Sequence, residues 1–385
     1  MMVVSKQHQI FFDFLRFCIG SDSEIPSSLK EADWKELYRI AQKQCLVGIL
    51  FDGIQKLPPA EVGMSKDLLL QWMMQCQMQE KANVRLNDAA IQVSEWFRKK
   101  GFRTCILKGQ GNALLYSNGL HRTPGDIDIW VEGGDKRVIS FVRSISPHEK
   151  ACYHHIEFPS YKGVEVEVHY RPSFLLCFWH DRKLQKYYER VKEEQFSHRV
   201  MLGEQGEIAI PTVEFNLIFQ LTHIYAHLMN EGIGLRQLLD YYYVLISDDL
   251  LVISDDLLVI SDDLLVIRDD LLVIRDRVQK ELKELGLWKF AGAIMYIMQE
   301  VFGMSASRLI VPPNEKYGRF VLNEVLEAGN FGKHDERNRF GRSKLGHNLQ
   351  RVYRDMRLVR YFPAEALSEP FFRVWHFFWR LKHRR

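Results

Sequence analysis

Two short motifs supply residue types that can bind a metal ion. Residues 108–111 are Lys-Gly-Gln-Gly, and a second motif carries Asp126 and Asp128, two positions apart. Alternate side chains of a β-strand share one face, so Asp126 and Asp128 should point the same way on a strand. Neighbouring carboxylates repel each other unless a cation lies between them, and their oxygen atoms favour a hard divalent ion such as Mg²⁺. We therefore predict that both aspartates bind a metal.

The same stretch offers groups that can hold a phosphate. Gly109 and Gly111 allow a tight turn, and the backbone N–H groups of such a turn can approach an anion. Lys108 and Arg122 can supply positive charge beside it. We therefore predict that Lys108, Gly109, Gln110 and Arg122 contact a phosphate-bearing ligand next to the two aspartates.

The surrounding pattern predicts the elements that must position these motifs. Ile127 and Ile129 alternate with the two aspartates and should point into a core. The predicted elements are a buried strand over 104–107, a short helix over 112–116, a strand over 126–131, a helix over 136–145, and a hairpin with strands over 153–158 and 164–170.

A glycine turn, a short helix and then Asp-x-Asp on a strand resembles the polymerase-beta-like nucleotidyltransferase superfamily. The local form, Leu-Lys-Gly followed by Arg-x-x-Gly-Asp-Ile-Asp, is similar to its bacterial "uncharacterised nucleotidyltransferase" branch, distantly similar to aminoglycoside nucleotidyltransferases and AbiEii-type toxins. The resemblance implies an NTP as donor substrate and two Mg²⁺ ions. One departure is Gln110, because the superfamily usually has Ser or Gly there and this chain lacks the hydroxyl.

The superfamily also uses a third carboxylate on a neighbouring strand. An alternating segment places Glu165, Glu167 and His169 on one face. In the resembled branch an acid stands two residues before a His, which selects Glu167, whereas strand alternation alone leaves Glu165 open. The resemblance thus implies that Glu167 joins Asp126 and Asp128 as a catalytic metal ligand.

Histidines near this segment suggest other roles. His154, His155 and His169 suggest a zinc site, but the usual zinc ligand spacing with cysteine support is absent from the sequence. A histidine on a strand is more often a hydrogen-bonded structural residue. Alternatively, His169 or another of these histidines forms a hydrogen bond with a ligating carboxylate and orients it.

The sequence beyond Pro211 predicts helices that carry further polar residues. His223 and His227 lie four apart on one helix, and Arg236 and Asp240 are likewise four apart and suggest an ion pair. The histidines suit a transition metal, the lining of a cleft or a hydrogen-bonded core. In the resembled branch such a His pair followed by Arg and Asp recurs, which implies that these residues face the acceptor side of the active site.

Composition is that of an ordinary globular protein. The chain has 385 residues, 46% of them hydrophobic and 26% charged, and its net charge of +3 is too small to indicate nucleic-acid binding by itself. Six scattered cysteines favour reduced thiols over a disulfide framework. A signal-peptide pattern and an apolar stretch of membrane-spanning length are both absent, which predicts a cytoplasmic protein.

The pattern divides the chain into three parts and predicts an α+β fold. N-terminal helices over 1–100 and a helical domain over 206–385 flank a small mixed-sheet core over 101–205, and the second helical part forms the other wall of a cleft. Within it, residues 250–277 are four near-identical heptads, Leu-Leu-Val-Ile followed by three polar residues. They indicate a recent in-frame expansion. We predict that the segment forms an extended helix that self-associates.

The aromatic tail, residues 370–385, contains five Lys or Arg and no acid. Such a segment suits an anionic membrane surface or nucleic acid, or a terminal helix docked through its aromatic residues.

The function predicted from these features is metal-dependent transfer of a nucleoside monophosphate from an NTP to a small-molecule or RNA acceptor. One alternative is a non-catalytic nucleotide-binding or interaction protein that retains the fold. Another is an AbiEii-like toxin that modifies tRNA. The sequence leaves the acceptor, the preferred nucleotide and the oligomeric state open.

Overall fold

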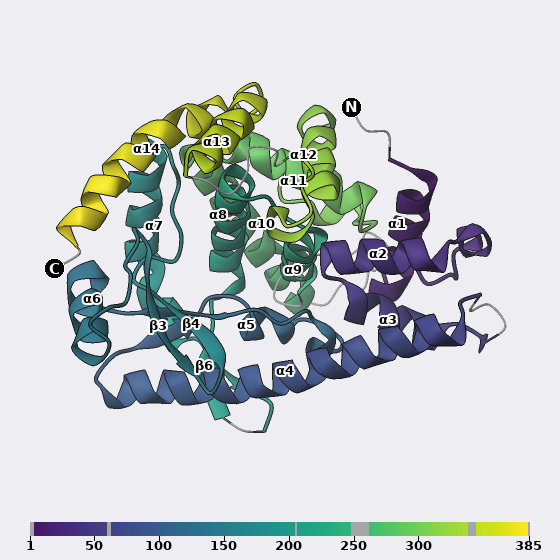
Figure 1. The fold of residues 1–385 in the computed structure, drawn as a ribbon, viewed down its shortest axis with the longest axis horizontal. Coiled ribbons are helices and arrows are strands. Elements are labelled where there is room, and N and C mark those ends of the chain that lie inside the picture. The colour runs from purple at the N-terminus through teal and green to yellow at the C-terminus, as the bar shows by residue number, and fades with distance from the viewer. Residues whose placement is uncertain (1–3, 60–62, 205, 248–261, 338–343, 384–385) are drawn as a thin grey trace.

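A computed structural model describes residues 4–59, 63–204, 206–247, 262–337 and 344–383. A small sheet lies between a long helix and a larger set of C-terminal helices, with further N-terminal helices at one end of the molecule (Figure 1). The predicted α+β fold is confirmed. Among the described residues, no helix is both long enough and apolar enough to cross a membrane.

The N-terminal part begins with three helices and continues into a long fourth. These are α1 (Lys6–Ile19), α2 (Trp34–Gln44), α3 (Val47–Lys56) and α4 (Lys66–Lys99). The hydroxyl of Ser65 accepts a hydrogen bond from the backbone N–H of Leu68 and so caps α4. Helix α4 runs along one side of the molecule, beneath α3 and the sheet (Figure 1), so the N-terminal helices and the sheet share one support.

The central sheet is mixed, as predicted. Its order is β1 (Thr104–Ile106), β2 (Ile127–Val131), β4 (Val164–His169) and β3 (His155–Tyr161). Strands β2 and β4 pair in parallel, and the other two pairs are antiparallel. Ile127 and Ile129 are buried in a core formed with α4, as the alternating pattern predicts.

Two local boundaries differ from the sequence prediction. Strand β3 continues through Pro159 to Tyr161, and it tolerates a proline because it is an edge strand. The turn is therefore confined to Lys162 and Gly163, which both have positive φ. The short helix after the glycine turn, α5 (Gln110–Ala113), also begins earlier than predicted, directly after Gly109.

The remaining elements are helices and one short hairpin. They are α6 (Gly134–Ile145), α7 (Phe178–Ser197), the hairpin β5 (Arg199–Leu202) and β6 (Gly206–Ala209), α8 (Val213–Asn230), α9 (Leu235–Ile246), α10 (Asp262–Glu284), α11 (Trp288–Glu300), α12 (Glu315–Ala328), α13 (Lys344–Leu358) and α14 (Pro363–Lys382). Short 3-10 turns occur at Ser27–Glu31, Gly119–His121, Ala306–Arg308 and Asn330–Gly332.

Part of the heptad segment and the aromatic tail are helical. Residues 262–277 lie within α10, as predicted, whereas residues 248–261 lie outside the described residues. In α14, Phe372 is buried and its ring stacks on Phe174, but Phe371 and Phe378 are exposed. The tail is therefore a terminal helix docked by some of its aromatic residues. Self-association of the heptads and contact of the tail with a membrane surface stay predictions.

Candidate functional site

The sheet brings three carboxylates together. Asp128 on β2 lies opposite Glu167 in the parallel ladder with β4, and Asp126 directly precedes β2. One carboxylate oxygen from each of the three residues lies within 4.8 Å of the others. Asp128 is buried, while Asp126 and Glu167 are half-buried and remain open to a ligand.

The geometry distinguishes the two candidate glutamates. The residue pairs between β2 and β4 begin at Ile127 and Val166, so Glu165 precedes the ladder and is exposed. Glu167 is one step inside the ladder and faces the aspartates. The carboxylate cluster therefore contains Glu167, as the resemblance implies, and not Glu165.

His169 joins two of these carboxylates. Its Nε2 lies 2.9 Å from Oδ1 of Asp128 and 3.5 Å from Oε2 of Glu167. Burial disfavours the charged form of the His169 imidazole. The hydrogen bonds to both carboxylates outweigh this effect of burial and raise the pKa of His169 to about 9. His169 is therefore protonated at neutral pH and holds two members of the cluster together.

Lys108 lies on the other side of Asp128. Its Nζ is 3.1 Å from Oδ2 of Asp128 and 2.9 Å from Nε2 of His223 on α8. Burial opposes the charged amine, yet Asp128 and Asp126 outweigh it and raise the pKa of Lys108. The predicted phosphate partner is thus charged, but it already forms an ion pair with a carboxylate of the cluster.

The charge states of the two aspartates differ. Burial disfavours ionisation of Asp128, but Lys108 and His169 outweigh it and hold the pKa of Asp128 well below its usual range. Repulsion from Asp128, with burial added, raises the pKa of Asp126. The buried carboxylate of Asp128 has its Oδ2 3.1 Å from the Lys108 amine. A metal ion bound at Oδ2 would replace this contact, and the all-carboxylate donor set of the cluster fits a hard divalent cation such as Mg²⁺.

Two arginines extend the site into a neighbouring cavity. Arg122 forms two hydrogen bonds of 2.7 Å with the carboxylate of Asp240, so its charge is compensated. Arg236 is 9% exposed, its Nε has no hydrogen-bond partner among the described residues, and one terminal nitrogen makes a 3.4 Å contact with the carbonyl of Thr123. The predicted Arg236–Asp240 ion pair is wrong, because Asp240 pairs with Arg122 instead.

One cavity connects the carboxylates with these basic residues. It lies between the two motifs and helices α8 and α9, as predicted for a cleft with a helical wall. Its lining consists of Lys108, Gly109, Asn112, Arg122, Gly125, Asp126, Asp128, Phe219, Gln220, His223, Ile224, Arg236, Gln237 and Asp240. Acidic groups that can hold a cation therefore face basic groups that can hold an anion.

A comparison of the sequence with family models identifies a family. A family model described as "Uncharacterised nucleotidyltransferase" matches residues 30–255, more than half of the chain. The chain belongs to this family. The matched range includes all the site residues predicted above, and the membership makes the chain a nucleotidyltransferase in the general sense of the family. Searches of curated proteins and of solved structures found no match.

Two predicted residues of this nucleotidyltransferase belong neither to the cavity lining nor to the contacts around the carboxylates. The side chain of Gln110 is buried and donates a hydrogen bond to Asn87 on α4. His227 contacts the ring of His223 at 4.3 Å between centroids and lies 3.7 Å from Glu231. A direct role of Gln110 in ligand binding is therefore limited to its backbone.

The glycine turn itself has the predicted form. Gly109 has a φ of +63°, and a Cβ at this position would lie 3.5 Å from the carbonyl oxygen of Asp126. The turn thus places backbone directly beside the aspartates.

Sequence reasoning missed Tyr116, which contacts a residue of the cavity lining. Its hydroxyl donates a 2.7 Å hydrogen bond to Asp240, beside Arg122. Asp240 is distant from Tyr116 in the sequence, and nothing in the local pattern around Tyr116 indicates this contact.

Proposed function

We propose that this protein transfers a nucleoside monophosphate from an NTP to an acceptor, and that Asp126, Asp128 and Glu167 hold two Mg²⁺ ions for the reaction. The observation that carries the proposal is the cluster of three carboxylates, two of which line a cavity that also contains Lys108, Arg122 and Arg236. When bound, the metal ions would stabilise charge on the entering and leaving oxygens of the displacement.

Arg236 supports the triphosphate part of the proposal. It is a buried cation in the cavity, whereas its neighbour Arg122 is compensated by Asp240. Arg236 forms no ion pair with a described residue, and a buried charge without an ion pair is costly, so an anionic ligand would gain strongly from meeting it. A Cβ at Gly125 would lie 3.9 Å from a terminal nitrogen of Arg236, which places this guanidinium near the turn before Asp126. We therefore assign Arg236 to phosphate binding.

Glu167 and His223 support the acceptor side. His169 outweighs the effect of burial and lowers the pKa of Glu167, so the Glu167 carboxylate is ionised at neutral pH and can accept a proton. Burial lowers the pKa of His223, so this histidine is neutral where it lines the cavity. We propose that Glu167 helps to deprotonate the acceptor hydroxyl and that His223 contacts the acceptor.

One contact favours the alternative of a non-catalytic nucleotide-binding protein. Lys108 forms an ion pair with Asp128, which is one of the proposed metal ligands. If Lys108 keeps this position when an NTP is bound, its charge replaces that of a metal ion. The two functions differ in whether a nucleoside monophosphate becomes covalently attached to another molecule.

Transfer of label tests the proposal and identifies the acceptor. The protein is incubated with Mg²⁺ and each NTP labelled at the α-phosphate, together with a small-molecule fraction or an RNA fraction of a cell extract. We expect the label to become covalently attached to molecules in one of the fractions. The Asp126→Asn/Asp128→Asn variant should attach no label. Label on tRNA, together with growth arrest on expression, would favour the toxin alternative. Binding without transfer in any fraction would favour the non-catalytic protein.

A further inference from the structure

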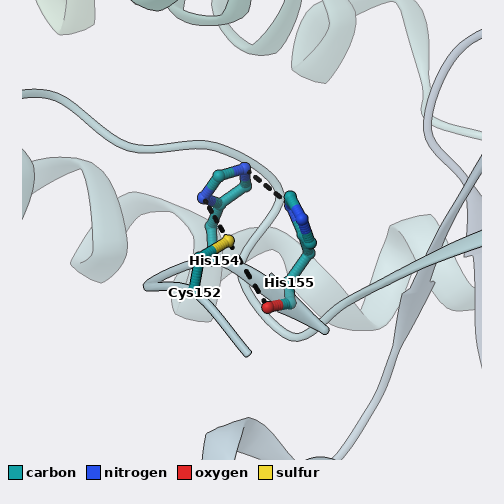
Figure 2. Close-up of side chains that lie close together, drawn as sticks. All are labelled: Cys152, His154 and His155. Atoms are coloured by element: carbon teal, nitrogen blue, oxygen red, sulfur yellow. Dashed lines mark hydrogen bonds between the residues drawn. The ribbon is translucent and has the colours of Figure 1, made fainter. Parts of the chain in front are cut away.

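A second group of potential metal ligands lies at the start of β3. Cys152, His154 and His155 each offer one donor atom within 4.8 Å of the other two. The sulfur of Cys152 is 3.8 Å from Nδ1 of His154, and Nε2 of His154 is 2.9 Å from Nδ1 of His155. Figure 2 shows the thiol and the two imidazole rings turned towards one another. These donors are sulfur and nitrogen, unlike the oxygen donors of the carboxylate cluster.

The backbone holds this group in place. The N–H of Cys152 donates a 2.9 Å hydrogen bond to the carbonyl of His155, which folds the chain back before the strand begins. The backbone N–H groups of Tyr170 and Arg171 both donate to the carbonyl of His154, at 3.0 and 3.1 Å. The bend is therefore anchored to the end of β4, and the three donors are brought together before any ligand binds.

The contact between the imidazoles must open before a metal binds. Nε2 of His154 and Nδ1 of His155 are 2.9 Å apart and share one N–H···N hydrogen bond, which occupies the lone pair of the accepting nitrogen. A metal that takes this lone pair replaces the hydrogen bond, because a neutral imidazole nitrogen is the form that ligates a metal. All three side chains are half-buried, so an ion can reach them.

We propose that Cys152, His154 and His155 bind a borderline-soft divalent cation, with Zn²⁺ as the expected ion. One sulfur and two nitrogen ligands with an open fourth position match the donor sets of tetrahedral zinc sites, and water would complete the coordination. Thiolate and imidazole ligands select such ions against Mg²⁺, whereas the carboxylate cluster favours hard ions. The two sites are neighbours, because Nδ1 of His155 lies 3.4 Å from Oε2 of Glu167, but their donor atoms differ. The test of the Cys152 cluster does not depend on transferase activity.

A third cluster provides a matched comparison. Cys177, His180 and Glu365 also place donor atoms within 4.8 Å of one another. There, Glu365 already accepts hydrogen bonds from the backbone N–H groups of Leu176 and Cys177. A metal at the third cluster would displace these two bonds to backbone N–H groups. At the Cys152 cluster it would displace one hydrogen bond between side chains and two longer sulfur contacts of 3.6 and 3.8 Å, so we assign the ion to the Cys152 cluster.

Cobalt spectroscopy of the full-length protein tests the site. Co²⁺ is added in excess Mg²⁺, and absorbance is recorded for the thiolate-to-cobalt charge-transfer band and for the visible bands of tetrahedral cobalt. We expect the charge-transfer band in the wild type, its displacement by Zn²⁺ and its loss in Cys152→Ser. His154→Ala should weaken Co²⁺ binding roughly tenfold or more, because it removes a ligand. Cys177→Ser should retain the band.

Three results would overturn the proposal. They are absence of a charge-transfer band in the wild type, persistence of the band in Cys152→Ser, and loss of the band in Cys177→Ser instead. Far-ultraviolet circular dichroism without added metal checks that each variant is folded. If Cys152→Ser does not fold, His154→Ala decides, and Co²⁺ affinity equal to that of the wild type would then contradict the site.

Discussion

Asp128 and Glu167 lie opposite each other in the parallel ladder between β2 and β4, and Nε2 of His169 contacts both carboxylates. Strand pairing therefore builds the candidate site from residues that are distant in the sequence. The protonated His169 compensates part of the negative charge and keeps both carboxylates ionised. Substitution of the acidic and basic residues around the cluster should therefore have different effects on activity, ligand binding and stability.

The two glutamates of β4 should differ in their effect on activity. We expect Glu167→Gln to lower kcat by about 100-fold or more, because it removes both a metal ligand and the proposed base. Glu165→Gln is the matched control and should leave kcat within about twofold, because Glu165 is exposed and lies outside the cluster. Rates of pyrophosphate release measure both. A larger loss in Glu165→Gln than in Glu167→Gln would contradict the assignment.

The two buried arginines should separate ligand binding from stability. We expect Arg236→Gln to weaken NTP binding by about 10- to 100-fold, the size of a lost charge-assisted hydrogen bond, without lowering the melting temperature. Arg122→Gln should destabilise the fold by about 3–5 kcal/mol, because it leaves the buried charge of Asp240 without its ion pair. Calorimetry with a non-hydrolysable NTP and Mg²⁺, and thermal unfolding, measure the two effects.

The opposite pattern would contradict these roles. If Arg236→Gln unfolds the protein while Arg122→Gln binds NTP normally and stays stable, then Arg236 is the structural cation and the phosphate assignment fails.

His121, outside the cavity, should make stability depend on pH. Its ring nitrogens lie 2.5 Å from Asp52 and 2.8 Å from Glu80. The hydrogen bond to Asp52, helped by Glu80, raises the pKa of His121 above its ordinary value of 6.5 despite burial. A raised pKa stabilises the fold below the unfolded pKa, and this stabilisation is lost as pH rises through the folded pKa.

Urea unfolding of the wild type and His121→Gln at several pH values measures this effect. We expect the wild type to be more stable by about 1–3 kcal/mol at pH 6, with the difference shrinking as pH rises above 6.5. A difference that stays constant, or grows, with rising pH would show that the charged form of His121 does not stabilise the fold.

Local patterns predict some of this structure, and long-range packing decides the rest. Alternation along β2 is a local property, so the shared face of Asp126 and Asp128 follows from the sequence. Glu165 and Glu167 share one strand phase, so alternation cannot separate them. The resemblance selects Glu167, and the place where the β2–β4 ladder begins gives the physical reason. The pairing of Arg122 with Asp240 depends on how α9 packs against the segment that carries Arg122. Residue spacing along the sequence does not predict this packing.

Short elements were the hardest to predict. The β5–β6 hairpin has strands of four residues each, too short to give a clear alternating pattern, and it was not predicted. The continuation of β3 through Pro159 depends on its edge position, which the local sequence does not reveal.

Pyrophosphate release tests the central claim most directly. The wild type and the Asp126→Asn/Asp128→Asn variant are compared with each NTP, Mg²⁺ and the acceptor fraction that takes up label. We predict Mg²⁺-dependent release by the wild type, at least about 1,000-fold faster than by the double variant, because the variant lacks two of the three carboxylates that hold the ions. Equal release by the two proteins, or none by the wild type despite Mg²⁺-dependent NTP binding, would contradict catalysis by the carboxylate cluster.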